Sequence, residues 1–205
     1  WQDLNDCGFV SGQAYAKGLR TVKTCVGNVW CRFGTQDAMN MGITIEKLTW
    51  GSWTPHKFKI AVSGCPRNCA EATIKDLGII GVDSGWEIHI AGNGGIKVRV
   101  TDLLCKVETD EELLTYVKAF MQFYREDAYY LERTAHWVER TGLQYVKDVM
   151  LDKEKVAYYA KRFEISQKSA QVDPWAKAIE EGFTKEFNPI VINPEQSHSF
   201  EAKEI

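Results

Sequence analysis

Four of the six cysteines in this 205-residue chain fall into two spaced pairs. Cys25 and Cys31 have five residues between them, and Cys65 and Cys69 have three. Cysteine thiolates are the usual ligands of iron–sulfur clusters, and a [4Fe–4S] cubane takes a set of four. Two loops that each supply two thiolates would complete such a set. The spacing therefore favours a [4Fe–4S] centre held by these four residues.

Other interpretations of the cysteines fit less well. Structural zinc normally uses more closely spaced pairs than C-x5-C, although a zinc-stabilised module stays an alternative. A secreted disulfide scaffold would be smaller and denser in cysteine. Burial as an unligated thiol suits Cys7 and Cys105, which have no spaced partner. It suits residues 64–69 poorly, because Gly-Cys-Pro-Arg-Asn-Cys is typical of a loop.

Two strands are expected to aim these loops. Residues 21–24 and 58–62 are rich in β-forming side chains, and each run leads into a cysteine pair. A short helix is expected after Cys69. Rigid elements hold ligands more accurately than loops do, so this arrangement favours a preformed site. Trp30, between the first two cysteines, is expected to shield the centre from water or to pack in the core.

The rest of the first half also reads as mixed α and β structure. Alternation and flanking turn residues predict further strands, and three-to-four spacing of apolar residues predicts a helix. The strands cover 77–82, 86–91 and 97–100, and the helix covers 34–47.

From residue 108 the apolar pattern becomes helical and continues to about residue 140. Thr109 and Glu112 are spaced as a capping box, and Gly142 predicts the end of this helix. Further helices are predicted at 152–163 and 174–181. Strands followed by helices favour an α+β fold. Its parts would be a half-domain with a mixed sheet (1–107), a helical extension (108–187) and an extended tail (188–205).

Composition limits the function classes. Hydrophobic residues make up 44% of the chain and charged residues 26%, which are ordinary globular values. The net charge of −3 argues against a nucleic-acid binder, and no apolar run is long enough for a membrane helix. The chain begins without Met or a visible signal peptide, so we expect a piece of a longer cytoplasmic protein in a reducing compartment.

Two segments resemble a known family. Residues 24–34 and 62–72 resemble the signature segments of the sirohaem- and [4Fe–4S]-containing nitrite and sulfite reductases, and residues 75–82 and 91–95 continue the resemblance. Within that family, residues 11–24 and 123–142 are most similar to the NAD(P)H-dependent nitrite reductase branch, in its large subunit.

The resemblance implies a redox-centre fragment. All four cysteines would ligate the cluster, and Cys69 would also be the axial ligand of the sirohaem iron. Electrons would pass from cluster to sirohaem, and nitrite would be reduced to ammonia with six electrons. The resemblance also implies missing parts: the first half with its substrate-binding side chains, upstream FAD and NAD(P)H domains, and a small partner subunit. The fragment alone is expected to be inactive.

Alternatives of function stay open. A sulfite reductase of the same family would share these motifs, and a non-catalytic electron-transfer module would need the cluster alone. The resemblance also implies positive groups around the many carboxylates of sirohaem. The candidate cofactor-binding residues are Arg67, Asn68, Arg32, Lys23 and Arg20. Lys17 is a further candidate, and for Lys17, Lys23 and Arg20 a solvated surface charge is the competing interpretation.

Overall fold

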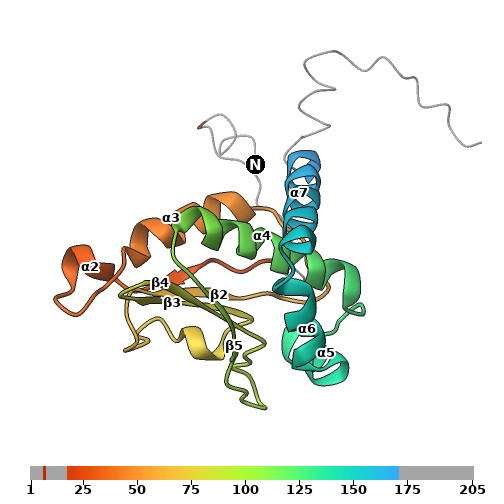
Figure 1. Cartoon of the computed structure of the whole chain (residues 1–205), viewed down its shortest axis with the longest axis horizontal. Helices are drawn as coiled ribbons and strands as arrows, with labels where there is room; N and C mark the ends of the chain where they lie inside the picture. The colour runs from red at the N-terminus through yellow and green to blue at the C-terminus, as the bar shows by residue number, and fades with distance from the viewer. Residues whose placement is uncertain (1–6, 8–17, 171–205) are drawn as a thin grey trace, which may run out of the picture. The chain divides into compact units, whose positions relative to one another are not determined.

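A five-stranded mixed sheet organises the part of the chain that this computed structural model describes, residue 7 and residues 18–170 (Figure 1). The strands lie across the sheet in chain order: β1 (Lys23–Thr24), β2 (Ile60–Ser63), β3 (Leu77–Val82), β4 (Gly85–Ile90) and β5 (Asp102–Val107). The strands β1, β2 and β3 run parallel to one another. The strand β4 runs antiparallel to β3, and β5 runs antiparallel to β4. The predicted α+β class with a mixed sheet followed by helices is confirmed.

Helices cover one face of this sheet. Figure 1 shows α3 (Ala38–Thr49) and α4 (Asp110–Asp127) lying along that side. Ile60 of β2 joins Ile45 of α3 and Phe120 of α4 in one buried cluster. Burial of such side chains contributes roughly 1.5–3 kcal/mol each relative to exposure. The cluster extends into the later helices, so sheet and helical extension share a core.

The opposite face is covered by the chain that follows β2. Ala61, Ala70, Ala72 and Ile80 form a small second buried cluster there, and Cys25 packs against it. Ala72 begins η1 (Ala72–Ile74), a single 3-10 turn that corresponds to the short helix predicted after Cys69. The small side chains of Ala70 and Ala72 let the segment after β2 lie close to the sheet. The second cysteine pair therefore lies at the end of the sheet.

The predicted helix over 108–140 is wrong in one respect. Its capped start is confirmed, because the Glu112 N–H donates to Thr109 Oγ1 at 3.2 Å. However, α4 ends at Asp127, and α5 (Thr134–Thr141) begins only after residues 128–133. The apolar periodicity continues through this break, because α5 turns back and buries Trp137 against α4. Periodicity reports which residues are buried, and a turn between two helices can preserve it.

Later helices extend the same core. Gly142, with φ of 88°, ends α5 as predicted. The sequence did not predict α6 (Leu143–Met150), which follows at once, and α7 (Lys153–Ala170) outruns its predicted end at 163. The predicted helix at 174–181 and the predicted tail lie outside the described residues. No helix in residues 18–170 is both long and apolar enough to cross a membrane.

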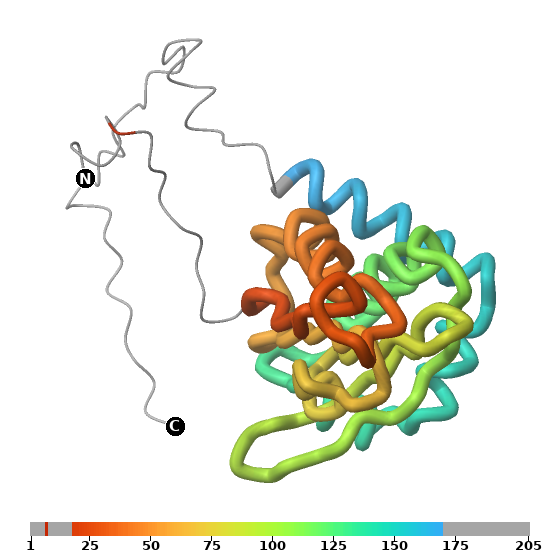
Figure 2. Tube along the Cα trace, turned by 90° about the vertical axis from the view of Figure 1, so that its left-hand side faces the viewer, coloured from red at the N-terminus to blue at the C-terminus, as the bar shows by residue number. Residues whose placement is uncertain are grey.

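The predicted strand at 97–100 is also wrong. Arg99 makes only an isolated bridge with Asn93, and the next strand starts at Asp102. This segment loops out from the body of the domain, as the yellow-green arm in Figure 2 shows. Its alternating apolar residues are exposed, with Val98 at 66% and Val100 at 64%. A β-forming pattern needs a partner strand, and none of the described strands pairs with this arm, whose bridge joins two of its own residues.

Candidate functional site

Both cysteine pairs follow the carboxyl ends of neighbouring strands, β1 and β2. We call this end of the sheet the cysteine edge. Thr24, the last residue of β1, lies opposite Val62 of the parallel strand β2, and Cys25 follows directly. The Cys25 N–H donates to the Val62 carbonyl at 3.2 Å, and the Gly64 N–H donates to Cys25 Sγ at 3.1 Å. Because adjacent parallel strands end together, the two cysteine loops begin side by side (Figure 2).

The first loop is folded tightly upon itself. Its short helix α2 (Gly27–Trp30) begins at a glycine with φ of 66°, and the Cys31 N–H donates to the Gly27 carbonyl at 3.0 Å. The Gly34 N–H then donates to the Cys31 carbonyl at 2.9 Å. A Cβ on Gly34 would lie 2.5 Å from the backbone N of Asn28, so no side chain fits there.

Backbone hydrogen bonds join the first loop to the second. The Gly64 carbonyl accepts from the N–H of Thr35 at 2.8 Å, from Thr35 Oγ1 at 2.9 Å and from the N–H of Gln36 at 3.0 Å. A Cβ on Gly64 would meet the Gln36 carbonyl oxygen at 2.7 Å. The helix α3 starts at Ala38 rather than at the predicted Gly34 because Asp37 caps it, with its Oδ1 accepting from the Asn40 N–H at 3.1 Å.

The Asn68 side chain forms hydrogen bonds that hold the second loop in its turn. Its Oδ1 accepts from the Ala72 N–H at 2.6 Å, and its Nδ2 donates to Thr73 Oγ1 at 2.7 Å. Asn68 itself has a left-handed backbone with φ of 56°, which Asn tolerates better than most residues. In this structure Asn68 therefore shapes the Cys65–Cys69 loop, and its predicted contact with a cofactor stays a prediction.

The chemistry of this donor set suits a cysteine-ligated cluster. Cys65 is buried, Cys25 and Cys31 are half-buried, and Cys69 is exposed. Within residues 7 and 18–170, no three His, Cys, Asp or Glu side chains gather as the ligands of one metal ion would. The thiolates of a cubane bind separate irons and so stand farther apart than the ligands of a single ion. Two adjoining loops with two cysteines each supply the donor type that such a cluster needs.

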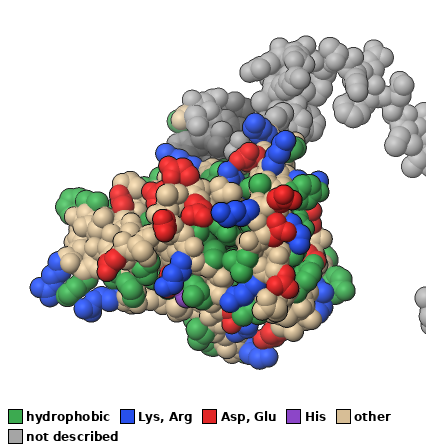
Figure 3. All heavy atoms as spheres, viewed as in Figure 1, with side chains coloured by type: hydrophobic (Ala, Val, Ile, Leu, Met, Phe, Trp, Pro, Cys, Tyr) green, Lys and Arg blue, Asp and Glu red, His purple; other side chains and the backbone are tan. Residues whose placement is uncertain are grey.

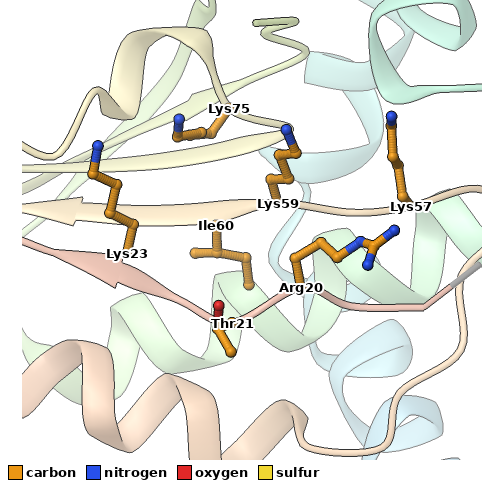
Figure 4. A pocket seen from close by; sticks show the side chains of 7 residues that line it. All are labelled: Arg20, Thr21, Lys23, Lys57, Lys59, Ile60 and Lys75. Atoms are coloured by element: carbon orange, nitrogen blue, oxygen red, sulfur yellow. The ribbon is translucent and has the colours of Figure 1, made fainter. Parts of the chain in front are cut away.

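A cation-lined cavity of about 420 Å³ lies along the same strands (Figure 4). Five basic side chains line it together with Thr21 and Ile60: Arg20, Lys23, Lys57, Lys59 and Lys75. The pKa of Lys59 is lowered by burial and then by the nearby charges of Arg133, Lys57 and Lys75. The cavity is therefore a region of positive potential that suits a ligand with several carboxylates.

The sequence missed three of these five cations. Arg20 and Lys23 were predicted, whereas Lys57, Lys59 and Lys75 were not. A signal was present, because alternate residues of a strand point to one face. Lys57 and Lys59 therefore share a face, and Lys23 joins it because it pairs with Ala61 in the sheet register. Lys23 and Lys75 also contact Glu71, at 2.9 and 3.1 Å.

Arg32 and Arg67 lie apart from the cavity lining. Their guanidinium carbons lie 4.6 and 3.9 Å from the centre of the Phe33 ring. The predicted cofactor-binding residues thus separate into a cavity pair, an arginine pair on Phe33, and Asn68 inside the loop. Lys17 lies outside the described residues. Which of these side chains contact a cofactor stays a prediction.

Three apolar side chains of the first loop itself are exposed. Val26, Val29 and Trp30 are exposed by 47%, 60% and 76%. Figure 3 shows hydrophobic and basic side chains together at the end of the molecule where α2 lies. The expectation that Trp30 packs in the core is wrong, because its ring lies on the surface of this domain.

Cys105 differs from the four loop cysteines. It lies on β5, at the sheet edge opposite to β1. Burial, followed by the nearby charge of Glu112, raises the pKa of its thiol to about 12. Since the thiolate is the form that binds metals and reacts, Cys105 is an inert packing residue at neutral pH.

Comparison with protein families gives a direct match. The model of the nitrite and sulphite reductase 4Fe-4S domain matches residues 15–157. An NAD(P)H nitrite reductase of Bacillus subtilis (strain 168) is 54% identical over 181 residues, which are 88% of this chain and 22% of that protein. An assimilatory-type sulfite reductase of Nitratidesulfovibrio vulgaris is 34% identical over 151 residues, 74% of this chain and 68% of that protein.

Solved structures agree on the fold. A dissimilatory sulfite reductase I has a TM-score of 0.62 at 15% identity, with 74% of this chain and 56% of that chain covered.

The large subunit of the NADH nitrite reductase of Escherichia coli (strain K12) is 47% identical in sequence, over 74% of this chain and 18% of that protein. The chain thus spans about a fifth of the nitrite reductases that it matches. On its cysteine motifs, its fold and this family match, the chain belongs to the nitrite and sulphite reductase 4Fe-4S domain family.

Proposed function

We propose that this chain is the redox-centre half of a sirohaem nitrite reductase. One observation carries the proposal: both cysteine loops leave adjoining parallel strands at one edge, and a cavity lined by five cations follows the same strands. Cys25, Cys31, Cys65 and Cys69 would hold a [4Fe–4S] cluster, and Cys69, which is exposed, would also reach the sirohaem iron. When bound, these groups would relay electrons from the NAD(P)H and FAD sites of the intact protein for the six-electron reduction of nitrite to ammonia.

The chain's own residues have defined tasks in this proposal. The Gly64 N–H, already bonded to Cys25 Sγ, offsets part of the thiolate charge. Lys57 and Lys59 would pair with sirohaem carboxylates, and their partial burial strengthens that pairing by limiting competition from water. Lys23 and Lys75, held on Glu71, would lie at the rim.

Nitrite is proposed before sulfite because the nitrite reductases match at higher identity, 47% and 54% against 34%. Those proteins are about five times longer than this chain's matching part. We propose that the rest of the intact protein supplies the other half of the sirohaem pocket, the substrate-binding side chains, and the FAD and NAD(P)H sites. The isolated chain would then hold a cluster but turn over no nitrite.

The first test is an iron and acid-labile sulfide assay on the chain purified without oxygen, with a visible spectrum of the same sample. About four irons and four sulfides per chain are expected. Cys69→Ser should lower both, whereas Cys105→Ser should leave both unchanged. Zinc, or no metal in a folded chain, would overturn the cluster assignment.

The sirohaem assignment needs the intact reductase. Lys57→Gln with Lys59→Gln should lower sirohaem occupancy, measured from the visible bands, while cluster iron is retained. Lys106→Gln, on the far strand β5, is the matched control. Arg67→Ala is also expected to lower occupancy. Full sirohaem occupancy in both the lysine double variant and Arg67→Ala would rule out these side chains as carboxylate partners. Cluster iron without sirohaem bands in the native reductase would instead favour a cluster-only electron carrier.

A further inference from the structure

Phe33 lies between two guanidinium groups that come from different cysteine loops. Arg32 precedes it in the first loop, and Arg67 lies between Cys65 and Cys69 in the second. Their guanidinium carbons are 4.6 and 3.9 Å from the ring centre, within the range of favourable cation–π contact. A single ring therefore bridges the two loops that carry the four cysteines.

Core packing does not account for this ring. Phe33 is 44% exposed, and it belongs to neither buried cluster of the described residues. Its backbone is nevertheless held firmly, because the Gly34 N–H after it bonds to the Cys31 carbonyl. The first loop thus holds the backbone that carries the ring, and Arg67 of the second loop lies over the ring.

The arrangement also brings two like charges together. Arg32 and Arg67 repel each other, and two exposed arginines would ordinarily turn apart into solvent. The negative face of an aromatic ring offsets this repulsion. The result is a concentration of positive charge next to ligand positions 31, 65 and 69.

We propose that Phe33 is a positioning residue that holds Arg32 and Arg67 beside the cluster and so raises its reduction potential. A cubane with four thiolates is anionic and gains a further negative charge on reduction. Fixed cations nearby favour the reduced form, and cluster potentials respond to charge and hydrogen bonding of this kind. The inference rests on the proposed cluster, but it does not depend on sirohaem or on the choice of nitrite.

The test is the midpoint potential of the cluster in the reconstituted chain, followed by EPR under anaerobic conditions. Phe33→Ala should move the potential to a more negative value, and Phe33→Tyr, which keeps the ring, should restore it. Arg67→Gln and Arg32→Gln should shift it in the same direction as Phe33→Ala. Because Phe33 acts through the arginines, Arg67→Gln should shift the potential less in a Phe33→Ala background than in the native chain.

A matched control is available elsewhere in the chain. The Arg140 guanidinium carbon lies 4.0 Å from the Tyr129 ring centre, so Tyr129→Ala removes a similar contact far from the cysteine loops in sequence. Its potential should be unchanged. Phe33→Leu guards against poor folding, because it keeps apolar bulk without a ring and should still shift the potential.

The outcomes separate this inference from the proposed function. A native chain that binds no cluster would refute the function and remove the basis for the inference. A loaded Phe33→Ala or Phe33→Leu chain with the native potential would overturn the inference alone. Equal Arg67→Gln shifts with and without Phe33 would also overturn it, since the ring would then not act through the arginine.

Discussion

Two regions of this domain are held together in opposite ways. At the cysteine edge, the loops are joined by backbone hydrogen bonds to Gly64 and by the exposed stack on Phe33. Between the sheet and the helical extension, the main polar tie is a fully buried carboxylate. Asp76 accepts two contacts from Arg133 Nη2 at 2.8 and 3.0 Å and one from Arg133 Nε at 3.1 Å.

The contact between Asp76 and Arg133, which we call the buried seam, is nearly closed to solvent. Asp76 also accepts from Thr134 Oγ1 at 2.6 Å and from the Lys59 N–H at 2.9 Å. Burial raises the pKa of the Asp76 carboxyl, whereas Arg133 and these donors favour its ionised form. Four donor groups thus compensate one charge. The helical extension is tied to the start of β3, beside Lys59 and Lys75 of the cavity.

The buried ion pair belongs to the rigid framework of the domain, whereas the cysteine loops form the candidate site. A buried ion pair tolerates little movement, because losing one partner leaves an uncompensated charge in the interior. This ion pair holds the starts of β2 and β3 together. The cysteine edge keeps Cys69, Arg32 and Arg67 exposed, where a cofactor or the rest of a longer protein can reach them. Three variants test this contrast.

The largest effect is expected at the seam. Asp76→Ala leaves Arg133 buried without its partner and should destabilise the chain by about 3–5 kcal/mol. The measurement is urea unfolding of the cluster-free chain. Lys106→Ala breaks the surface pair of Lys106 with Glu87 and should cost about 0–1 kcal/mol. Equal losses in the two variants would show that the seam is no stronger than a surface ion pair.

A smaller effect is expected at the cysteine edge. Gly64→Ala forces a Cβ to within 2.7 Å of the Gln36 carbonyl oxygen, so the two loops must move apart. Overpacking of this kind should cost about 1–3 kcal/mol, and cluster loading should fall with it. Gly95→Ala is the control, since its Cβ would meet only the flexible Asn93 side chain, at 3.1 Å. Native cluster loading in Gly64→Ala would contradict the close junction between the loops.

The smallest effect concerns pH at the turn between α4 and α5. A hydrogen bond from Arg140 holds the pKa of Glu132 below its usual value. The ionised pair thus adds stability above the pKa of glutamate in the unfolded chain, and this stability is lost as pH falls through the lowered folded value. Glu132→Gln should therefore be less stable than the native chain at pH 7. The gap should narrow at acid pH in urea unfolding of the cluster-free chain.

Local sequence alone determined several elements. The strand over 77–82 has the predicted bounds, and the start of α4 follows from Thr109 and Glu112. Such features depend on neighbouring residues only: alternation, a cap and a turn glycine. The cysteine spacing is equally local, and with the adjoining signature residues it was sufficient to predict the family that the comparisons confirm.

Tertiary contacts decided the rest. The break at 128–133 ends at Arg133, which pairs with Asp76, 57 residues earlier in the chain. Residues 97–100 alternate like a strand but lack a partner along their length. The cavity joins lysines from three segments, and the stack on Phe33 joins two loops. A pattern read along the chain reports local preference and burial, whereas partners distant in sequence are chosen only when strand register and helix packing bring them together.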